Sequence, residues 1–243
     1  MKLFFNPIKV LGKTLLVVGL TSALGGASLF AQTIYTGTLA NLAATGGSLV
    51  IGDKTFSGFN FEATGLTAFD PTAITVTASE SGGVDYLTWA GTIAVDNSVG
   101  TANSVGDLSL FYTVTANPGS INMIDQEYTP LVTASPALGQ IIIGETVANN
   151  QGITVANSTL TLNPIDLSDP QPEPGDNLNI NPSEHQLYVE KDILITAVAG
   201  NVVGLVNVVQ SFHQVPEPGT LLLGSLGGAL LLLLNLRRQG RRN

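Results

Sequence analysis

Apolar and polar residues alternate along several stretches in the middle of the chain, the pattern of strands that bury one face. In residues 73–79 (AITVTAS), Ile74, Val76 and Ala78 share one face. Similar β-branched and aromatic runs, bounded by Gly, Asn, Asp and Pro, recur at residues 86–95, 107–115, 140–143, 153–162, 186–198 and 201–212. No stretch between them has a convincing helical pattern. The chain is therefore predicted to be mainly β, an antiparallel, jelly-roll-like β-sandwich rather than parallel βαβ units.

The N-terminus departs from this pattern. An apolar stretch ending in small residues follows three lysines, Lys2, Lys9 and Lys13. This order is typical of a secretory signal peptide, and cleavage after Ala27 or Ala31 fits it. We therefore assign residues 1–31 to a signal for the Sec export machinery. The alternative is an uncleaved membrane anchor, because no charged residue stands between Lys13 and Asp53.

The C-terminus also departs from it. Residues 219–236 form a run of 18 uncharged residues, ten of them leucine. A helix of this length covers roughly 27 Å, enough for a short transmembrane helix. Basic residues beside a membrane span tend to stay in the cytoplasm, which would place the bulk of the chain on the other side. Here the basic residues are Arg237, Arg238, Arg241 and Arg242. A buried core helix with a basic tail is the less favoured interpretation.

A proline-rich tetrapeptide directly precedes this run and consists of Val215, Pro216, Glu217 and Pro218. Prolines fix φ and remove amide donors, so the tetrapeptide is a stiff, extended strip that a processing enzyme can bind at little entropic cost. Residues 215–243 resemble the PEP-CTERM sorting signal of exosortase-bearing bacteria. The resemblance implies recognition in the membrane by exosortase, a cysteine transpeptidase-like membrane protein, and removal of the tail. It also implies bacteria that make exopolysaccharide and biofilm.

The charge between the two signals is strongly negative. In residues 32–218 only Lys54 and Lys191 oppose 18 acids, which gives a net charge of −16. Such a surface repels phosphates, so nucleic acid is excluded as a partner. The charge suits solubility outside the cell or loose binding of cations. The chain has no cysteine, which excludes disulfides, thiolate metal sites and cysteine nucleophiles.

Residues 163–183 hold five prolines and four acids and are predicted to be a long loop within the domain formed by residues 32–214. The loop also contains a second Pro-Glu-Pro, centred on Glu173, but no apolar run follows it. Its acids are weak candidates for Ca²⁺, which takes several oxygen ligands, although their spacing matches no EF-hand. A solvated acidic loop is favoured. The four acids are Asp166, Asp169, Glu173 and Asp176.

Other candidate chemistry is sparse. His185 and His213 stand apart from any metal-ligand spacing, and the chain has neither a G-x-S-x-G motif nor a phosphate-binding glycine loop. Trp89, the only tryptophan, either stacks on a sugar or is buried in the sandwich, and burial is favoured. Phe59 and Phe61 share a strand face and are predicted to belong to the core.

Together with what the PEP-CTERM resemblance implies, these observations predict an exported, exosortase-sorted protein of the cell surface or the biofilm matrix, associated with exopolysaccharide. It would be anchored in the membrane by its C-terminal helix and become surface-bound or extracellular after processing. Its β-sandwich is predicted to be non-catalytic. The alternative is a secreted carbohydrate-binding module, with calcium in the loop of residues 163–183. A secreted hydrolase is the least favoured hypothesis, because no nucleophile or metal cluster stands out.

Overall fold

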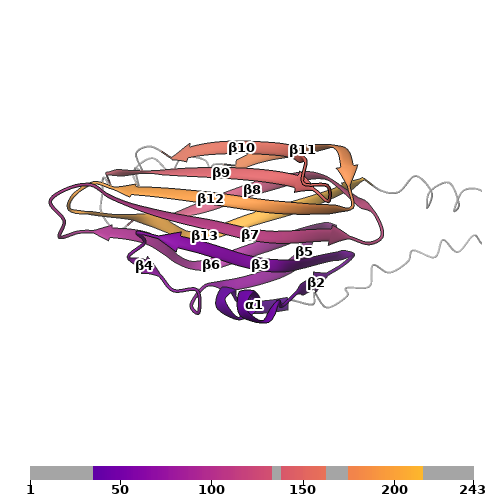
Figure 1. Ribbon diagram of the computed structural model, residues 1–243, viewed down its shortest axis with the longest axis horizontal. Coiled ribbons are helices and arrows are strands. Elements are labelled where there is room, and N and C mark those ends of the chain that lie inside the picture. Colours follow the sequence, from indigo (N-terminus) through magenta and orange to yellow (C-terminus); the bar gives the residue numbers. More distant parts are fainter. Residues whose placement is uncertain (1–34, 133–137, 163–174, 216–243) are drawn as a thin grey trace, which may run out of the picture. The chain divides into compact units, whose positions relative to one another are not determined.

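The computed structural model describes residues 35–132, 138–162 and 175–215 (Figure 1). The chain divides into two units, Met1–Ala31 and Gln32–Asn243, and every described residue lies in the second. The predicted signal peptide, and the sorting segment from Pro216 onward, lie outside the described residues. Within the described ranges, no helix combines the length and the apolarity that crossing a membrane requires.

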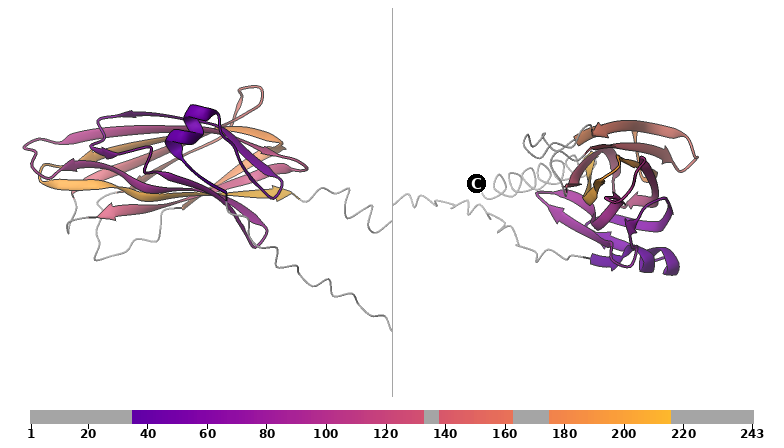
Figure 2. Two further views of the ribbon diagram at one scale, coloured as in Figure 1. Left: turned by 90° about the horizontal axis from the view of Figure 1, so that it is seen from below. Right: turned by 90° about the vertical axis from the view of Figure 1, so that its left-hand side faces the viewer.

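The described residues form two antiparallel sheets that face each other (Figures 1 and 2). Sheet A runs in the order β1 (Tyr35–Thr38), β5 (Thr75–Ser81), β6 (Val84–Asn97), β13 (Asn201–Val215), β8 (Ser120–Val132) and β11 (Gly175–Glu184), and β4 (Ala68–Phe69) also pairs with β6. Sheet B runs in the order β10 (Thr154–Leu162), β9 (Gly139–Asn149), β12 (Gln186–Ala197), β7 (Ser104–Ala116), β3 (Lys54–Thr64) and β2 (Leu49–Ile51). The predicted antiparallel β-sandwich is confirmed, and its jelly-roll-like character stays a prediction.

Strict alternation on the central strands builds the core between the sheets. On β7, Leu108, Leu110, Tyr112 and Val114 are buried, and the residues that alternate with them face outward. The core also contains Trp89, which is 1% exposed and whose ring centroid lies 5.3 Å from that of Tyr112. The favoured interpretation of Trp89 as a core residue is therefore confirmed, and this indole cannot offer a face to a sugar.

A bulge on β3 lets two phenylalanines of opposite parity enter the same core. The register of β3 on β7 shifts between Ser57 and Asn60, and Gly58 at this shift has φ +64°. A glycine adopts this conformation without steric cost. As a result, both Phe56 and Phe59 are buried. Phe61 packs against the core on the face that it shares with Phe59, as predicted.

The structure also contains elements that the sequence pattern did not predict. Helix α1 (Leu39–Thr45) begins after Thr38, whose side chain accepts a hydrogen bond from the Asn41 amide, and ends at the left-handed Gly46. Strand β11 occupies the second part of the segment predicted to be a loop, because Leu178 and Ile180 alternate and are buried. The acidic segment between β10 and β11 is thus shorter than predicted, and residues 163–174 lie outside the described part.

Candidate functional site

The outer face of sheet B carries two neighbouring aromatic side chains. Tyr188 on β12 lies opposite Thr113 on β7, and Glu190 lies opposite Phe111. Tyr188 and Phe111 are therefore diagonal neighbours on one face, a distance that aromatic side chains span. Tyr188 is 45% exposed although it stands on a central strand of the sheet. An aromatic ring that stays exposed there is available to a ligand.

A shallow hollow of about 240 Å³ lies beside these rings, and it is lined by Gly58, Phe111, Thr113, Thr146, Tyr188 and Glu190 among others. Gly58 helps to keep it open, since a Cβ there would stand 3.4 Å from Thr113 Oγ1. The hollow thus combines aromatic surface with hydroxyl and carboxylate groups. This combination suits a small polar ligand that has one apolar face.

A carboxylate pair adds negative charge to the same outer face. Asp192 lies opposite Ser109, whose hydroxyl donates to its Oδ1 at 3.4 Å. Burial, followed by the hydrogen bond with Asp192, raises the pKa of the Asp107 carboxyl above its usual value. Two acids that are held this close resist simultaneous ionisation. The negative charge on this part of sheet B therefore disfavours the binding of anionic ligands.

A second hollow, of about 430 Å³, lies on sheet A and has Tyr86, Asp125, Glu127, Asp176 and Ser211 in its lining. Next to it, His213 Nε2 lies 2.8 Å from Asp125 Oδ2. Ser211 Oγ lies 3.2 Å from both of these atoms. A serine, a histidine and an aspartate thus meet on the outer face of the sheet.

This trio differs from the relay of a serine hydrolase. In such a relay the carboxylate binds one imidazole nitrogen and the serine hydroxyl binds the other. Here Asp125 and Ser211 contact the same nitrogen, Nε2, and also contact each other. With both groups at Nε2, the imidazole cannot take the serine proton on one nitrogen while the carboxylate holds the other nitrogen in place. The arrangement is a closed triangle of hydrogen bonds that ties β8 to β13.

The two lysines of the described residues both lie inside the sandwich. Lys54 is 2% exposed, and its Nζ lies 2.6 Å from Asp85 Oδ2 and 3.1 Å from Asp53 Oδ1. Lys191 is fully buried. No arginine occurs in the described ranges. The surface formed by these residues therefore carries carboxylates without any lysine or arginine to balance them.

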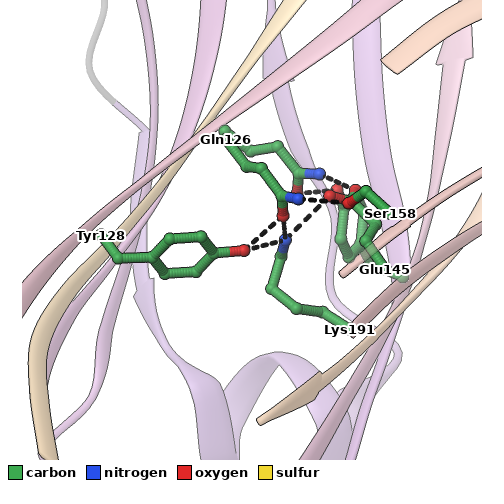
Figure 3. Close-up of polar contacts among 7 residues, drawn as sticks. Gln126, Tyr128, Glu145, Ser158 and Lys191 are labelled. Atoms are coloured by element: carbon green, nitrogen blue, oxygen red, sulfur yellow. Dashed lines mark hydrogen bonds and ion pairs between the residues drawn. The ribbon is translucent and has the colours of Figure 1, made fainter. Parts of the chain in front are cut away.

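Lys191 is the centre of a buried polar network that joins the two sheets (Figure 3). Its Nζ donates to Gln126 Oε1 at 2.6 Å, to Tyr128 OH at 2.8 Å and to Glu145 Oε2 at 3.0 Å. Gln126 and Tyr128 belong to β8 of sheet A, whereas Glu145 and Lys191 belong to sheet B. All three protons of the ammonium group thus have an acceptor. Burial nevertheless lowers the pKa of Lys191, against the opposing effect of Glu145.

Further side chains complete the network. Gln210 donates to Glu145 Oε1 and accepts a hydrogen bond from Tyr112 OH. Tyr128 OH donates to Gln126 Oε1, and the Gln126 amide nitrogen donates to Ser158 Oγ at 2.6 Å. Burial, reinforced by the nearby Glu145 carboxylate, holds the pKa of both tyrosines well above its usual range. The two phenols therefore remain protonated donors.

The sequence-predicted site residues fall in different places. Asp176 lies opposite Gln126 on the pairing of β11 with β8, where its charge is felt by Lys191. The other calcium candidates, Asp166, Asp169 and Glu173, lie outside the described residues. Among the residues described, no group of three or more His, Asp or Glu side chains is placed to hold a metal ion.

The sorting motif also falls largely outside the described residues. Val215 ends β13 and is the last residue described. The tripeptide Pro216–Pro218 and the arginine cluster at residues 237–242 come after it. The prediction of a sorting signal therefore continues to rest on the sequence pattern.

Sequence reasoning missed both the Tyr188 face and the Lys191 network. Tyr188 has the opposite parity to its buried neighbours Leu187 and Val189, and this marks it as outward-facing. Lys191 has the same parity as Val189 and Ile193, and this marks it as inward-facing. Both signals were present in the alternation of β12.

Comparisons with known proteins give low similarities. No protein-family model matches the chain, and no curated protein matches it. Among solved structures, a carbohydrate-binding module of the β-sandwich superfamily is 11% identical with a TM-score of 0.33 and covers 65% of this chain, which spans 57% of that module. A family 29 carbohydrate-binding module in complex with mannohexaose is 16% identical with a TM-score of 0.21, over 74% of this chain and 92% of that one.

A third structure, a glycosylation-associated protein complex from Streptococcus agalactiae, is 10% identical with a TM-score of 0.26, over 64% of this chain and 26% of that one. Similarities at this level assign neither a fold family nor a function to the chain. The functional proposal therefore depends on the side chains described above.

Proposed function

We propose that this chain is an exported, non-catalytic β-sandwich protein that binds neutral polysaccharide on the outer face of sheet B. The observation that carries the proposal is the pair formed by Tyr188 and Phe111 beside a hollow lined with hydroxyl and carboxylate groups. A sugar ring presents C–H groups on its face and hydroxyls around its rim. An exposed aromatic ring flanked by Thr113, Thr146 and Glu190 matches both kinds of group.

The charge distribution supports a neutral ligand rather than an acidic one. Both lysines of the described part are buried, so no ammonium group is available to bind a uronate or sulfate group. Glu190 and the pair of Asp107 and Asp192 add negative charge on the same face. Like charges raise the free energy of an encounter complex. Neutral hexose polymers avoid this penalty, and their hydroxyls can donate hydrogen bonds to the carboxylates.

Delivery to the cell exterior is the second part of the proposal. It is supported by the basic and apolar N-terminus and by the order of Pro-Glu-Pro, apolar run and arginines at the C-terminus. We assign the chain to the substrates of exosortase on this order. The exported sandwich would then meet exopolysaccharide in the matrix around the cell.

Binding is tested with the full chain on an array of neutral and acidic polysaccharides. Tyr188→Ala should lower affinity for the bound neutral glycan at least tenfold, because it removes the exposed ring. Tyr35→Ala is the matched control, since Tyr35 is 43% exposed but stands on β1 of sheet A. Addition of EDTA tests for a calcium requirement. Wild-type protein that binds no neutral glycan, or Tyr188→Ala protein that binds normally, would refute this part and favour a purely structural matrix role.

Sorting is tested separately by the mass of the chain in a host with exosortase. Glu217→Ala should leave a full-length membrane form, because the stiff tripeptide loses its charged group. Glu173→Ala alters the other Pro-Glu-Pro, which no apolar run follows, and should be processed like the wild type. A wild-type chain that keeps its arginine tail in this host would show that the segment acts only as an anchor.

A further inference from the structure

The groups around Lys191 are those that an amide-forming reaction needs. A nucleophilic nitrogen, Lys191 Nζ, stands 2.6 Å from the side-chain amide oxygen of Gln126. A carboxylate, Glu145, stands 3.0 Å from the same nitrogen. Tyr128 OH donates a hydrogen bond to the amide oxygen, and Ser158 Oγ accepts one from the amide nitrogen (Figure 3). The network is therefore more than a set of compensated buried charges.

We propose that Lys191 and Gln126 form an intramolecular isopeptide bond, with the release of ammonia, that covalently joins sheet B to sheet A. The bond would connect Nζ of Lys191 on β12 to Cδ of Gln126 on β8. It requires Nζ, which now lies 2.6 Å from the amide oxygen, to leave this hydrogen bond and approach Cδ from above the plane of the amide, until the two atoms are about 1.3 Å apart in the new bond. Rotation about the four flexible side-chain bonds of a lysine permits such a shift.

The reaction balances without any external reagent. Glu145 takes one proton from the Lys191 ammonium, and the neutral amine attacks Cδ of Gln126. As the new N–C bond forms and the C–Nε2 bond breaks, a second proton passes through Glu145 to Nε2, which leaves as ammonia. The proton that remains on Glu145 departs with the ammonia as ammonium. No oxidation or reduction occurs, and the carboxylate of Glu145 is regenerated.

The environment favours each step of this reaction. Burial lowers the pKa of Lys191 and so favours the neutral, nucleophilic amine. Tyr128, whose hydroxyl keeps its proton, points at the oxygen on which negative charge develops. Lys191, Gln126, Glu145 and Tyr128 are all buried, each at most 2% exposed, so water that would hydrolyse an intermediate has little access. Glu145 is held in place by Gln210, which donates to its other oxygen.

A bond at this position would close the chain between residues 126 and 191. A cross-link stabilises a fold mainly by restricting the unfolded chain. A protein without cysteine has no disulfide to do this. Unlike a disulfide, an isopeptide bond is not broken by reducing agents.

The experiment is peptide mapping by mass spectrometry on the full chain, purified folded and then digested at acidic residues. The expected result is one linked species that contains the Gln126 peptide and the Lys191 peptide and is lighter than their sum by one ammonia. Fragmentation must locate the loss, because cyclisation of Gln32, exposed by cleavage after Ala31, would release ammonia too. Folded wild-type protein that yields both peptides separate and unmodified would overturn the proposal.

Two variants sharpen the result. Glu145→Gln keeps the size of the side chain but cannot take up a proton, and folded protein of this variant should show no linked species. Lys54→Met removes the other buried lysine and should leave the linked species at the wild-type level. Circular dichroism confirms that each variant is folded. A linked species that persists undiminished in Glu145→Gln would contradict the assigned role of the carboxylate.

Discussion

The two buried lysines have different kinds of partners. Lys54 lies between two carboxylates, Asp85 and Asp53, and the side chain of Asp53 is 24% exposed. Lys191 has one carboxylate, Glu145, and neutral acceptors on Gln126 and Tyr128, and each of these three side chains is at most 2% exposed. The Lys54 site has two carboxylates in contact with the lysine, one of them partly exposed, whereas at the Lys191 site one carboxylate contacts the lysine and the contacting groups are buried.

This difference indicates different roles. At Lys54, water can reach Asp53 and replace a lost partner, so the ion pairs mainly tie β3 to β6 near the surface. At Lys191, the removal of any member leaves a polar atom that water cannot satisfy. A buried site of this kind is costly to form unless each polar atom has a hydrogen-bond partner or a covalent bond. It is also a site where an amine can react with an amide.

The largest expected effect is that of Lys191→Met. It leaves the Glu145 carboxylate buried without its cation, and such a loss destabilises folded proteins by about 3–5 kcal/mol. The measurement is the free energy of unfolding from urea titration, monitored by circular dichroism. The double variant Lys191→Met with Glu145→Gln removes both charges and should recover part of the loss. Equal stability of the single variant and the wild type would refute the description of a buried, closed site.

Lys54→Met should cost less, about 1–3 kcal/mol, because Asp53 can be solvated and Asp85 can take up a proton instead. The same urea titration ranks the two variants on one scale. A larger loss for Lys54→Met than for Lys191→Met would reverse the contrast drawn between the sites. Double mutants with Asp85→Asn isolate the ion-pair contribution from the loss of packing.

The pH dependence of stability should also separate the sites. Burial, partly opposed by Lys54, raises the pKa of the Asp85 carboxyl above its usual 3.8. The folded protein then keeps this proton to a higher pH than the unfolded chain does. The stability that it contributes is therefore complete below about pH 3.8 and is lost as the pH rises through the raised pKa. Asp85→Asn should remove this loss of stability with rising pH, and Lys54→Met should move the loss to higher pH.

Lys191 should change the pH dependence of stability in the alkaline range, and its effect should have the opposite sign to that of Asp85. Burial lowers its pKa from 10.5, so the unfolded chain binds more protons between the lowered value and 10.5, and stability rises with pH there. An isopeptide bond abolishes this rise, because an amide nitrogen does not titrate. Unfolding measurements on the wild type in this range, with Glu145→Gln as the variant that lacks the bond, distinguish the two cases.

Much of the fold followed from the alternation of apolar residues. All seven predicted strands overlap observed ones, with different bounds, because each contains enough alternation to reveal a buried face. Strand β8 has less of it, since Gln126 occupies an inward position between Ile124 and Tyr128. Strand β11 was hidden by Pro182, by its acids and by the proline-rich residues before it, and its pairing with β8 supplies the hydrogen bonds that the local pattern does not reveal.

The candidate sites were less predictable for a physical reason. Parity along a strand gives the face on which a residue lies, but it does not give the strand that lies opposite. Lys191 and Glu145 both occupy inward positions, which can be inferred from sequence. That Gln126 of the other sheet meets them depends on how the two sheets pack. Contacts between sheets of this kind require the three-dimensional structure.

The smallest expected changes in stability come from replacing the outermost hydrogen-bond partner at each lysine site, Ser158 near Lys191 and Gln214 near Lys54. Ser158→Ala removes the hydroxyl to which the Gln126 amide donates at 2.6 Å, and Gln214→Ala removes the amide that donates to Asp53. Because Asp53 is partly solvated, water should replace Gln214 at almost no cost. The Gln126 side chain is only 2% exposed, so water should replace the Ser158 hydroxyl less readily, and Ser158→Ala should cost about 1 kcal/mol. Urea titration of both variants side by side measures the difference, and equal losses would mean that water reaches the Lys191 network as easily as it reaches Asp53.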